Sequence, residues 1–156
     1  NLLRSPSYPD PKADRAVQEF TYSLYPHLGD YEEGRVVREG YELNVPLRLI
    51  RGNASATEPQ LDKAGSFMTV DSDSIVVESI KKAEDSDDII IRFYECHGKA
   101  VSAKLNFGFQ ISDVEVVDLM EQKVDSDSWN KDTYELKFNP FEIKTIKVKL
   151  DVDKQQ

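Results

Sequence analysis

The chain has 156 residues, of which 39% are hydrophobic and 31% charged, a composition typical of one globular domain with a buried core. A net charge of −9 argues against a nucleic-acid partner, because phosphate backbones are bound by a surplus of Lys and Arg on one face. The single cysteine, Cys96, excludes an internal disulfide. The sequence contains no run of eighteen apolar residues, which a membrane-spanning helix would need.

The first fourteen residues predict a rigid loop. An apolar pair, Leu2-Leu3, is followed by Arg4, by three prolines between residues 6 and 11, and by Asp10 and Asp14. Proline fixes its own backbone angle and stiffens the chain around it. The loop either braces the fold or points Arg4 and the aspartates at a ligand.

Residues 19–25 predict a strand, because apolar and polar side chains alternate with the period of two that a half-buried strand shows. Phe20, Tyr22 and Leu24 would form the apolar face of this strand. The opposite face would then point toward water.

One short helix, at about residues 31–43, interrupts the β pattern. Asp30 followed by Glu33 is a variant of the capping box, and Pro46 ends the helix because the residue before a proline is pushed toward an extended form. The exposed loop that follows contains a possible glycosylation sequon at Asn53.

The remaining residues predict strands separated by turns of Asp and Ser. Residues 101–111 carry an apolar side chain at every odd position. The other predicted strands are Ser74–Lys81, Ile89–Glu95, Val114–Glu121, Tyr134–Phe138 and Ile143–Leu150. Many short strands and one helix predict an all-β, antiparallel β-sandwich that forms a single domain over residues 1–156. In the last strand, Lys147 and Lys149 are typical of an edge strand that avoids pairing with other molecules.

No self-sufficient active site is visible in the residues. The two histidines, His27 and His97, are far apart and lack the closely spaced ligands of a zinc site. On a strand, Cys96 and His97 would face opposite ways, which excludes a nucleophile–base pair, whereas Glu95 and His97 would share a face. Tyr8, Tyr25 and Trp129 are candidate carbohydrate contacts, although aromatic side chains on strands more often pack in a core.

Several segments resemble, in order along the chain, the C-terminal region of glycoside hydrolase family 38 α-mannosidases of the bacterial and cytosolic branch. The segments are Leu2–Pro6, Pro9–Pro11 with Asp14, Glu19–Tyr22, Pro26-His27, Glu39–Leu47, Lys82–Glu84, Arg92–Glu95, His97-Gly98, Val117–Leu119 and Pro140–Thr145.

The resemblance implies a piece of a longer, cytoplasmic enzyme of mannose metabolism. Members of the family are retaining exo-α-mannosidases that use an aspartate nucleophile, a carboxylic acid and a zinc ion in an N-terminal catalytic barrel. Those motifs do not occur in this sequence, so we expect no catalytic residue, no metal ligand and no cofactor here. The expected partners are the catalytic domain of the parent enzyme and a mannose-containing glycan, with neither nucleic acid nor membrane.

The resemblance also singles out the N-terminal loop, because an arginine-bearing segment of this region can approach the sugar site in the family. Arg4, Asp10 and Asp14 are the matching positions. The alternative for Arg4 is a salt bridge to Asp10 or Asp14 that ties the loop down. For the whole chain, the alternatives are an autonomous carbohydrate-binding module and a protein-interaction domain.

Overall fold

The computed structural model describes residues 2–51, 65–125, 129–131 and 133–151. The chain divides into two units, residues 1–46 and 47–156, and all the strands named below belong to the second. The predicted sequon at Asn53 lies outside the described residues. Nothing in the described part of the chain forms a helix with the length and apolar content that a bilayer span requires.

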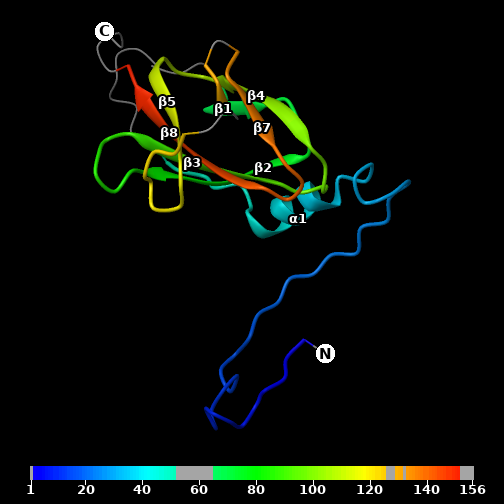
Figure 1. Cartoon of the computed structure of the whole chain (residues 1–156). Coiled ribbons are helices and arrows are strands. Elements are labelled where there is room, and N and C mark those ends of the chain that lie inside the picture. The colour runs from blue at the N-terminus through cyan, green and yellow to red at the C-terminus, as the bar shows by residue number, and fades with distance from the viewer. Residues whose placement is uncertain (1, 52–64, 126–128, 132, 152–156) are drawn as a thin grey trace. The chain divides into compact units, whose positions relative to one another are not determined.

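The second unit is a sandwich of two antiparallel sheets, which confirms the predicted fold class (Figure 1). One sheet has the order β2-β3-β8-β5 and the other has the order β1-β4-β7-β6. The strands are β1 (Met68–Val70), β2 (Ile75–Lys82), β3 (Ile89–Glu95), β4 (Val101–Phe107), β5 (Ile111–Val117), β6 (Trp129–Asn130), β7 (Glu135–Phe138) and β8 (Ile143–Leu150).

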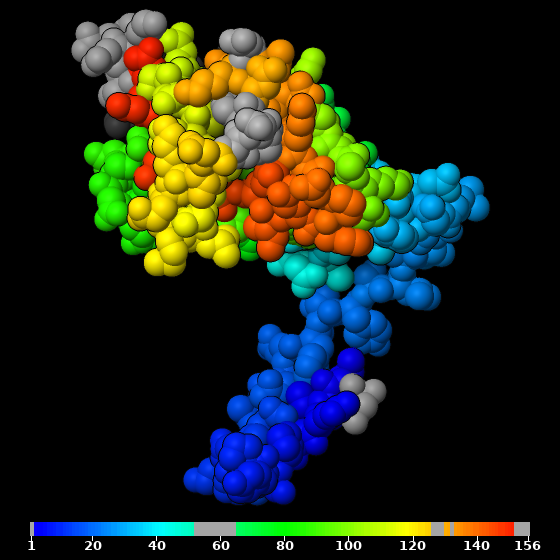
Figure 2. Space-filling view, viewed as in Figure 1, coloured from blue at the N-terminus to red at the C-terminus, as the bar shows by residue number. Residues whose placement is uncertain are grey.

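The core lies between the two sheets and is built from the inward-facing residues of inner and outer strands. Phe93 of β3 and Phe138 of β7 meet edge to face across it, with ring centroids 6.4 Å apart. Figure 2 shows the residues of this unit, coloured green to red, packed closely together. The other buried members of the cluster are Ile75, Ile91, Ala103, Leu105, Val114, Leu136, Ile146 and Val148.

The prediction that the last strand lies at a sheet edge is wrong, because β8 pairs with β3 on one side and with β5 on the other. In the register with β5, Lys147 lies opposite Glu115 and Lys149 lies opposite Asp113. The lysines therefore have acidic residues as cross-strand neighbours, which makes their charge compatible with an interior strand. Only part of the predicted apolar face is buried, since Ile143 remains 59% exposed.

The predicted strand 101–111 ends earlier, because the chain turns after Phe107 and β5 starts at Ile111. At the turn, the Gly108 N–H donates to the Phe67 carbonyl at 2.9 Å. A Cβ on Gly108 would lie 2.1 Å from the Ser66 carbonyl oxygen, so only glycine fits. Sequence reasoning missed β1 and β6, which are too short to show a period of two.

The first unit contains the helix α1 (Val36–Asn44), which begins five residues later than predicted. The predicted capping box forms: Asp30 Oδ1 accepts from the N–H of Glu33 at 3.0 Å, and Glu33 Oε2 accepts from the N–H of Asp30 at 3.3 Å. The helix does not continue from this turn because Arg35 adopts a left-handed backbone with φ of 52°. The helix ends before Pro46, as predicted, with Val45 outside the helical region at φ of −122° and ψ of 74°.

Residues 19–25 do not form a strand, which corrects the prediction made from their alternation. Their backbone is extended, but a strand also requires hydrogen bonds to a neighbouring strand. No such neighbour occurs among the described residues, and every side chain of this segment is exposed.

A matched pair of substitutions on β8 tests the observed register. Ile146→Ala removes a side chain that is 0% exposed and should lower the free energy of unfolding by about 2–5 kcal/mol through lost burial and a cavity. Ile143→Ala, on the same strand but exposed, should cost less than about 1 kcal/mol. Chemical denaturation measures both values, and equal losses would contradict the register.

Candidate functional site

One end of the sandwich carries a hollow lined by aromatic and polar side chains, which we call the aromatic hollow. Its volume is about 380 Å³. Phe107 contacts Tyr134 edge to face at a centroid distance of 6.0 Å and Phe109 at 5.7 Å. The residues that line it are Leu105, Asn106, Phe107, Phe109, Gln110, Ile111, Tyr134 and Asp151.

Strand pairing brings these residues together from distant parts of the sequence. Phe107 ends β4, Phe109 lies in the turn before β5, and Tyr134 directly precedes β7, which pairs with β4. The Tyr134 carbonyl accepts from the N–H of Leu105 at 2.9 Å. Tyr134 has a φ of 52°, which is uncommon for a bulky residue and occurs more often at functional positions.

The lining of the aromatic hollow is chemically suited to a polar ligand with an apolar face. Phe and Tyr rings offer flat apolar surfaces, while Asn106 and Gln110 provide both donors and acceptors, and Asp151 provides a carboxylate. A sugar presents such a combination of C–H face and hydroxyl groups. Sequence reasoning missed this site because its residues come from three separate segments.

The carbohydrate contacts predicted from sequence lie elsewhere. Tyr8 is exposed in the N-terminal loop, and Tyr25 stacks on His27 at a centroid distance of 5.6 Å, both within the first unit. Trp129 lies in β6 of the second unit, and its side chain is outside the described part of the structure. The roles given to these three residues stay predictions.

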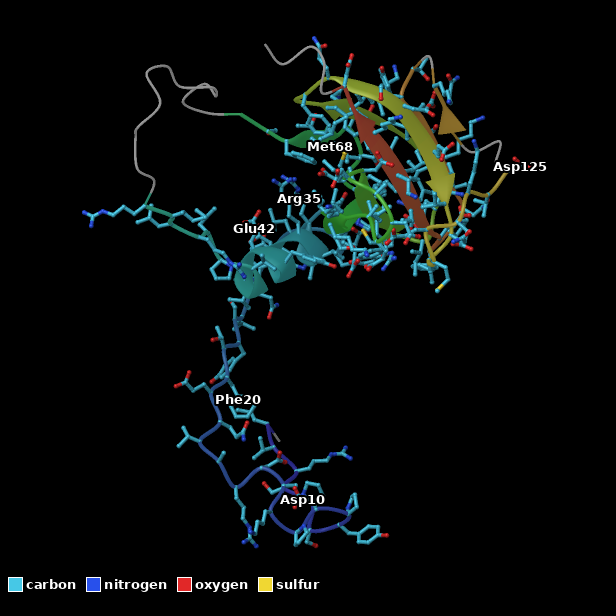
Figure 3. All side chains as sticks on the ribbon, turned by 90° about the vertical axis from the view of Figure 1, so that its left-hand side faces the viewer. Asp10, Phe20, Arg35, Glu42, Met68 and Asp125 are labelled. Carbon is cyan, nitrogen blue, oxygen red and sulfur yellow. The ribbon has the colours of Figure 1, made fainter. Side chains whose placement is uncertain are left out.

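The two aspartates of the N-terminal loop hold its backbone. Asp10 Oδ1 accepts from the N–H of Lys12 at 2.8 Å, and Asp14 Oδ2 accepts from the N–H of Ser5 at 3.1 Å (Figure 3 labels Asp10). Arg4 is exposed, and within residues 2–51 no ion pair joins it to Asp10 or Asp14. The aspartates therefore shape the loop without engaging the arginine.

Glu95, the last residue of β3, has a buried carboxylate that is 1% exposed. Its two oxygens accept from the N–H groups of His97 at 2.8 Å, Gly98 at 2.7 Å and Phe141 at 2.9 Å. The carboxylate thus joins the turn after β3 to the turn before β8. Gly98 has a φ of 73°, which confirms that it makes the predicted turn.

Burial raises the pKa of the Glu95 carboxyl, but the backbone donors of Phe141, His97 and Gly98 outweigh burial and hold the pKa below its ordinary value. The charged form is therefore stabilised by folding. The sequence prediction that Glu95 and His97 could touch is met in part, since Glu95 bonds the backbone of His97. The His97 Nδ1 lies 3.2 Å from the Ser74 hydroxyl.

A glutamine at position 95 tests this interpretation through pH. Glu95→Gln should lower the free energy of unfolding by about 1–3 kcal/mol at pH 7, because its amide faces N–H donors. The pKa of Glu95 is lower in the folded state than in the unfolded state, where it is 4.5. The charged carboxylate therefore contributes its full stabilisation above pH 4.5, and this stabilisation is lost as the pH falls through the pKa of the folded state.

The two proteins should therefore converge in stability below pH 4.5, as measured by chemical denaturation from pH 7 to pH 3. The exposed Glu78 on β2 provides the control, and Glu78→Gln should leave stability nearly unchanged at pH 7. A difference for Glu95→Gln that stays constant over this range would contradict the proposed role of the charge.

Among the residues that the structure describes, no group of three or more His, Cys, Asp or Glu side chains is placed to hold a metal ion. The carboxylates that lie near cations instead form ion pairs, such as Glu115 with Lys123 and Asp113 with Lys131, both at 2.6 Å. We therefore assign no metal ligand within the described ranges.

The sequence of the sandwich matches the profile of a known domain family. The profile of the glycosyl hydrolases family 38 C-terminal beta sandwich domain matches residues 74–146, which run from just before β2 into β8.

Similarity to known proteins extends over almost the whole chain. The chain is 38% identical to alpha-mannosidase G of Dictyostelium discoideum over 155 residues and 34% identical to alpha-mannosidase 2C1 of Mus musculus over 151 residues. Each alignment covers 94% of this chain and 14% of the relative. Alpha-mannosidase of Saccharomyces cerevisiae is 26% identical over 172 residues, which cover 95% of this chain and 15% of that protein.

The chain therefore spans about one seventh of the length of these relatives. Because the profile match falls on the observed sandwich, and the similarity to α-mannosidases covers 94% of the chain, this chain contains the C-terminal β-sandwich domain of the family 38 glycosyl hydrolases.

Proposed function

We propose that this chain is a non-catalytic C-terminal part of a zinc-dependent, retaining α-mannosidase that removes terminal α-mannosyl residues from glycans. The observation that carries the proposal is the family 38 C-terminal sandwich over residues 74–146 in a chain whose relatives are α-mannosidases about seven times its length. The catalytic carboxylates and the zinc would belong to the remaining polypeptide. We place the whole enzyme in the cytoplasm, where a lone cysteine such as Cys96 stays reduced.

The first proposed task of the chain is to support the catalytic domain, and its N-terminal loop is proposed to reach the sugar site. Asp10 and Asp14 fix the loop backbone through two hydrogen bonds, while the guanidinium of Arg4 stays exposed. A guanidinium presents several donors in a fixed plane and binds carboxylates or sugar hydroxyls well. Arg4 would therefore orient the substrate or a catalytic carboxylate, without taking part in bond breaking.

Substitution of Arg4 in the full-length enzyme tests this role. Arg4→Ala should lower kcat/KM for an aryl α-mannoside by about tenfold to a hundredfold, because a hydrogen bond from a charged donor contributes about 1.5–3 kcal/mol. The melting temperature should change by less than about 2 °C, since the side chain is exposed.

The exposed Arg15, at the end of the same loop, provides the control, and Arg15→Ala should leave the kinetics unchanged. Normal kinetics for Arg4→Ala, together with a large fall in melting temperature, would contradict a role at the sugar site and indicate a structural brace.

A second candidate function is carbohydrate binding by the sandwich itself. It is favoured by the aromatic hollow, where Phe107 and Tyr134 stand beside the amides of Asn106 and Gln110. In this function the hollow would hold a glycan apart from the site of hydrolysis.

Titration of the chain with mannose and mannobiose, followed by amide chemical shifts, distinguishes the two functions. Saturable binding in the millimolar range, lost in Tyr134→Ala and kept in Tyr8→Ala, would support carbohydrate binding at the aromatic hollow. Binding that is lost in Tyr8→Ala instead would place the contact in the N-terminal loop. The absence of binding would leave support of the catalytic domain as the function.

A further inference from the structure

Residues 19–25 have the side-chain pattern of a half-buried strand but no sheet to bury it. Their apolar face is open to solvent: Phe20 is 50% exposed, Tyr22 is 80% exposed and Leu24 is 93% exposed. Figure 3 shows Phe20 on an extended stretch of backbone. Three large apolar side chains in a row on one face are unusual for a surface that stays in water, and such a face marks an interaction site.

The backbone of the segment is equally unpartnered. Within residues 2–51, residues 17–25 make no backbone hydrogen bond, and Figure 1 draws them as a plain extended ribbon. An extended chain with free N–H and C=O groups on both sides is a template for pairing with a sheet edge.

The two faces of the segment differ in their surroundings. On the odd-numbered face, Ser23 and Tyr25 border a hollow of about 310 Å³ together with Val36 and Leu43 of α1. The even-numbered face has no comparable neighbour among the described residues of the first unit. This arrangement is typical of a strand with a helix on one face and a sheet-lined core on the other.

The sandwich of this chain is a poor partner for a seven-residue strand. Of its four outer strands, β1 has three residues and β6 has two. The other two carry irregular registers, between Val77 and Ser79 in β2 and between Ile111 and Asp113 in β5. Short strands and bulges are the features by which proteins prevent pairing at sheet edges.

The rest of the polypeptide supplies a better candidate. The family's sandwich domain is matched only from residue 74 onward, so residues 19–25 lie outside it. The relatives extend far beyond the aligned part, which covers 14% of their length. A long polypeptide outside these residues is therefore available to provide a sheet.

We propose that residues 19–25 join, as an added strand, the edge of a β-sheet formed by the part of the same polypeptide that lies outside residues 1–156. Phe20, Tyr22 and Leu24 enter the apolar core of that sheet, and the backbone groups complete its hydrogen-bond ladder. The N-terminal residues then belong structurally to a neighbouring domain, and the sandwich follows it. This inference rests on the proposed function in one respect, that the chain is part of a longer polypeptide, and it does not depend on turnover.

Amide hydrogen exchange, read by mass spectrometry on peptides that cover residues 17–25, tests the proposal. In the full-length protein these amides should exchange at least about a hundredfold more slowly than in the 156-residue chain, because strand pairing protects them. Equally fast exchange in both would overturn the proposal. Protection of these amides that is already present in the 156-residue chain would also overturn the proposal. If that protection rises with protein concentration, the segment pairs between copies of the chain; if it does not, the segment pairs within one chain.

Two substitutions in the full-length protein test which face is buried. Leu24→Asp places a charge on the apolar face and should abolish most of the protection of residues 17–25. Ser23→Asp, one residue away on the other face, is the matched control and should retain at least a tenfold protection. If Ser23→Asp loses the protection of residues 17–25 while Leu24→Asp keeps it, the assignment of the buried face is overturned. If Leu24→Asp fails to fold, the exchange comparison of the unsubstituted proteins still decides the proposal.

Discussion

A strand is stable only when its backbone finds a hydrogen-bonding neighbour and its apolar face finds a core, and this double requirement organises the whole chain. In the second unit both needs are met. The interior strand β8 pairs on both edges, and Ile146 and Val148 on its inner face are completely buried. In the first unit, residues 19–25 meet neither need among the described residues. The same physical rule thus explains a closed sandwich and an unfinished strand in one chain.

Sequence periodicity predicted the sandwich well because its long strands bury one face. The bounds of β3 and β8 are the predicted ones, since both strands are rich in isoleucine and other apolar residues and have clear turn residues at their ends. Periodicity alone could not reveal which strands are neighbours. β8 is an interior strand because it pairs with β3 and with β5, and both of these strands lie far from β8 in the sequence. The lysines suggested an edge because the facing carboxylates, Asp113 and Glu115, are visible only in the register.

The helix and the candidate site show two further limits of sequence reasoning. The capping box at Asp30 and Glu33 was recognised and is formed, yet one left-handed residue, Arg35, delays the helix. That backbone angle has no clear signature in a non-glycine residue. The aromatic hollow was missed because each of its rings looked like an ordinary strand residue. Only the pairing of β4 with β7 brings Phe107 beside Tyr134.

The strand order of the sandwich has a consequence for how the domain can be divided. Each sheet interleaves early and late segments: β3 lies against β8, and β4 lies against β7. Glu95 adds a third link between these halves, since it bonds the backbone of Phe141, 46 residues later in the chain. A break in the connection between β5 and β6 would leave two fragments, neither with a complete core. Such fragments would fold only by recognising each other, so the domain is a natural candidate for conditional reassembly from two separately expressed pieces.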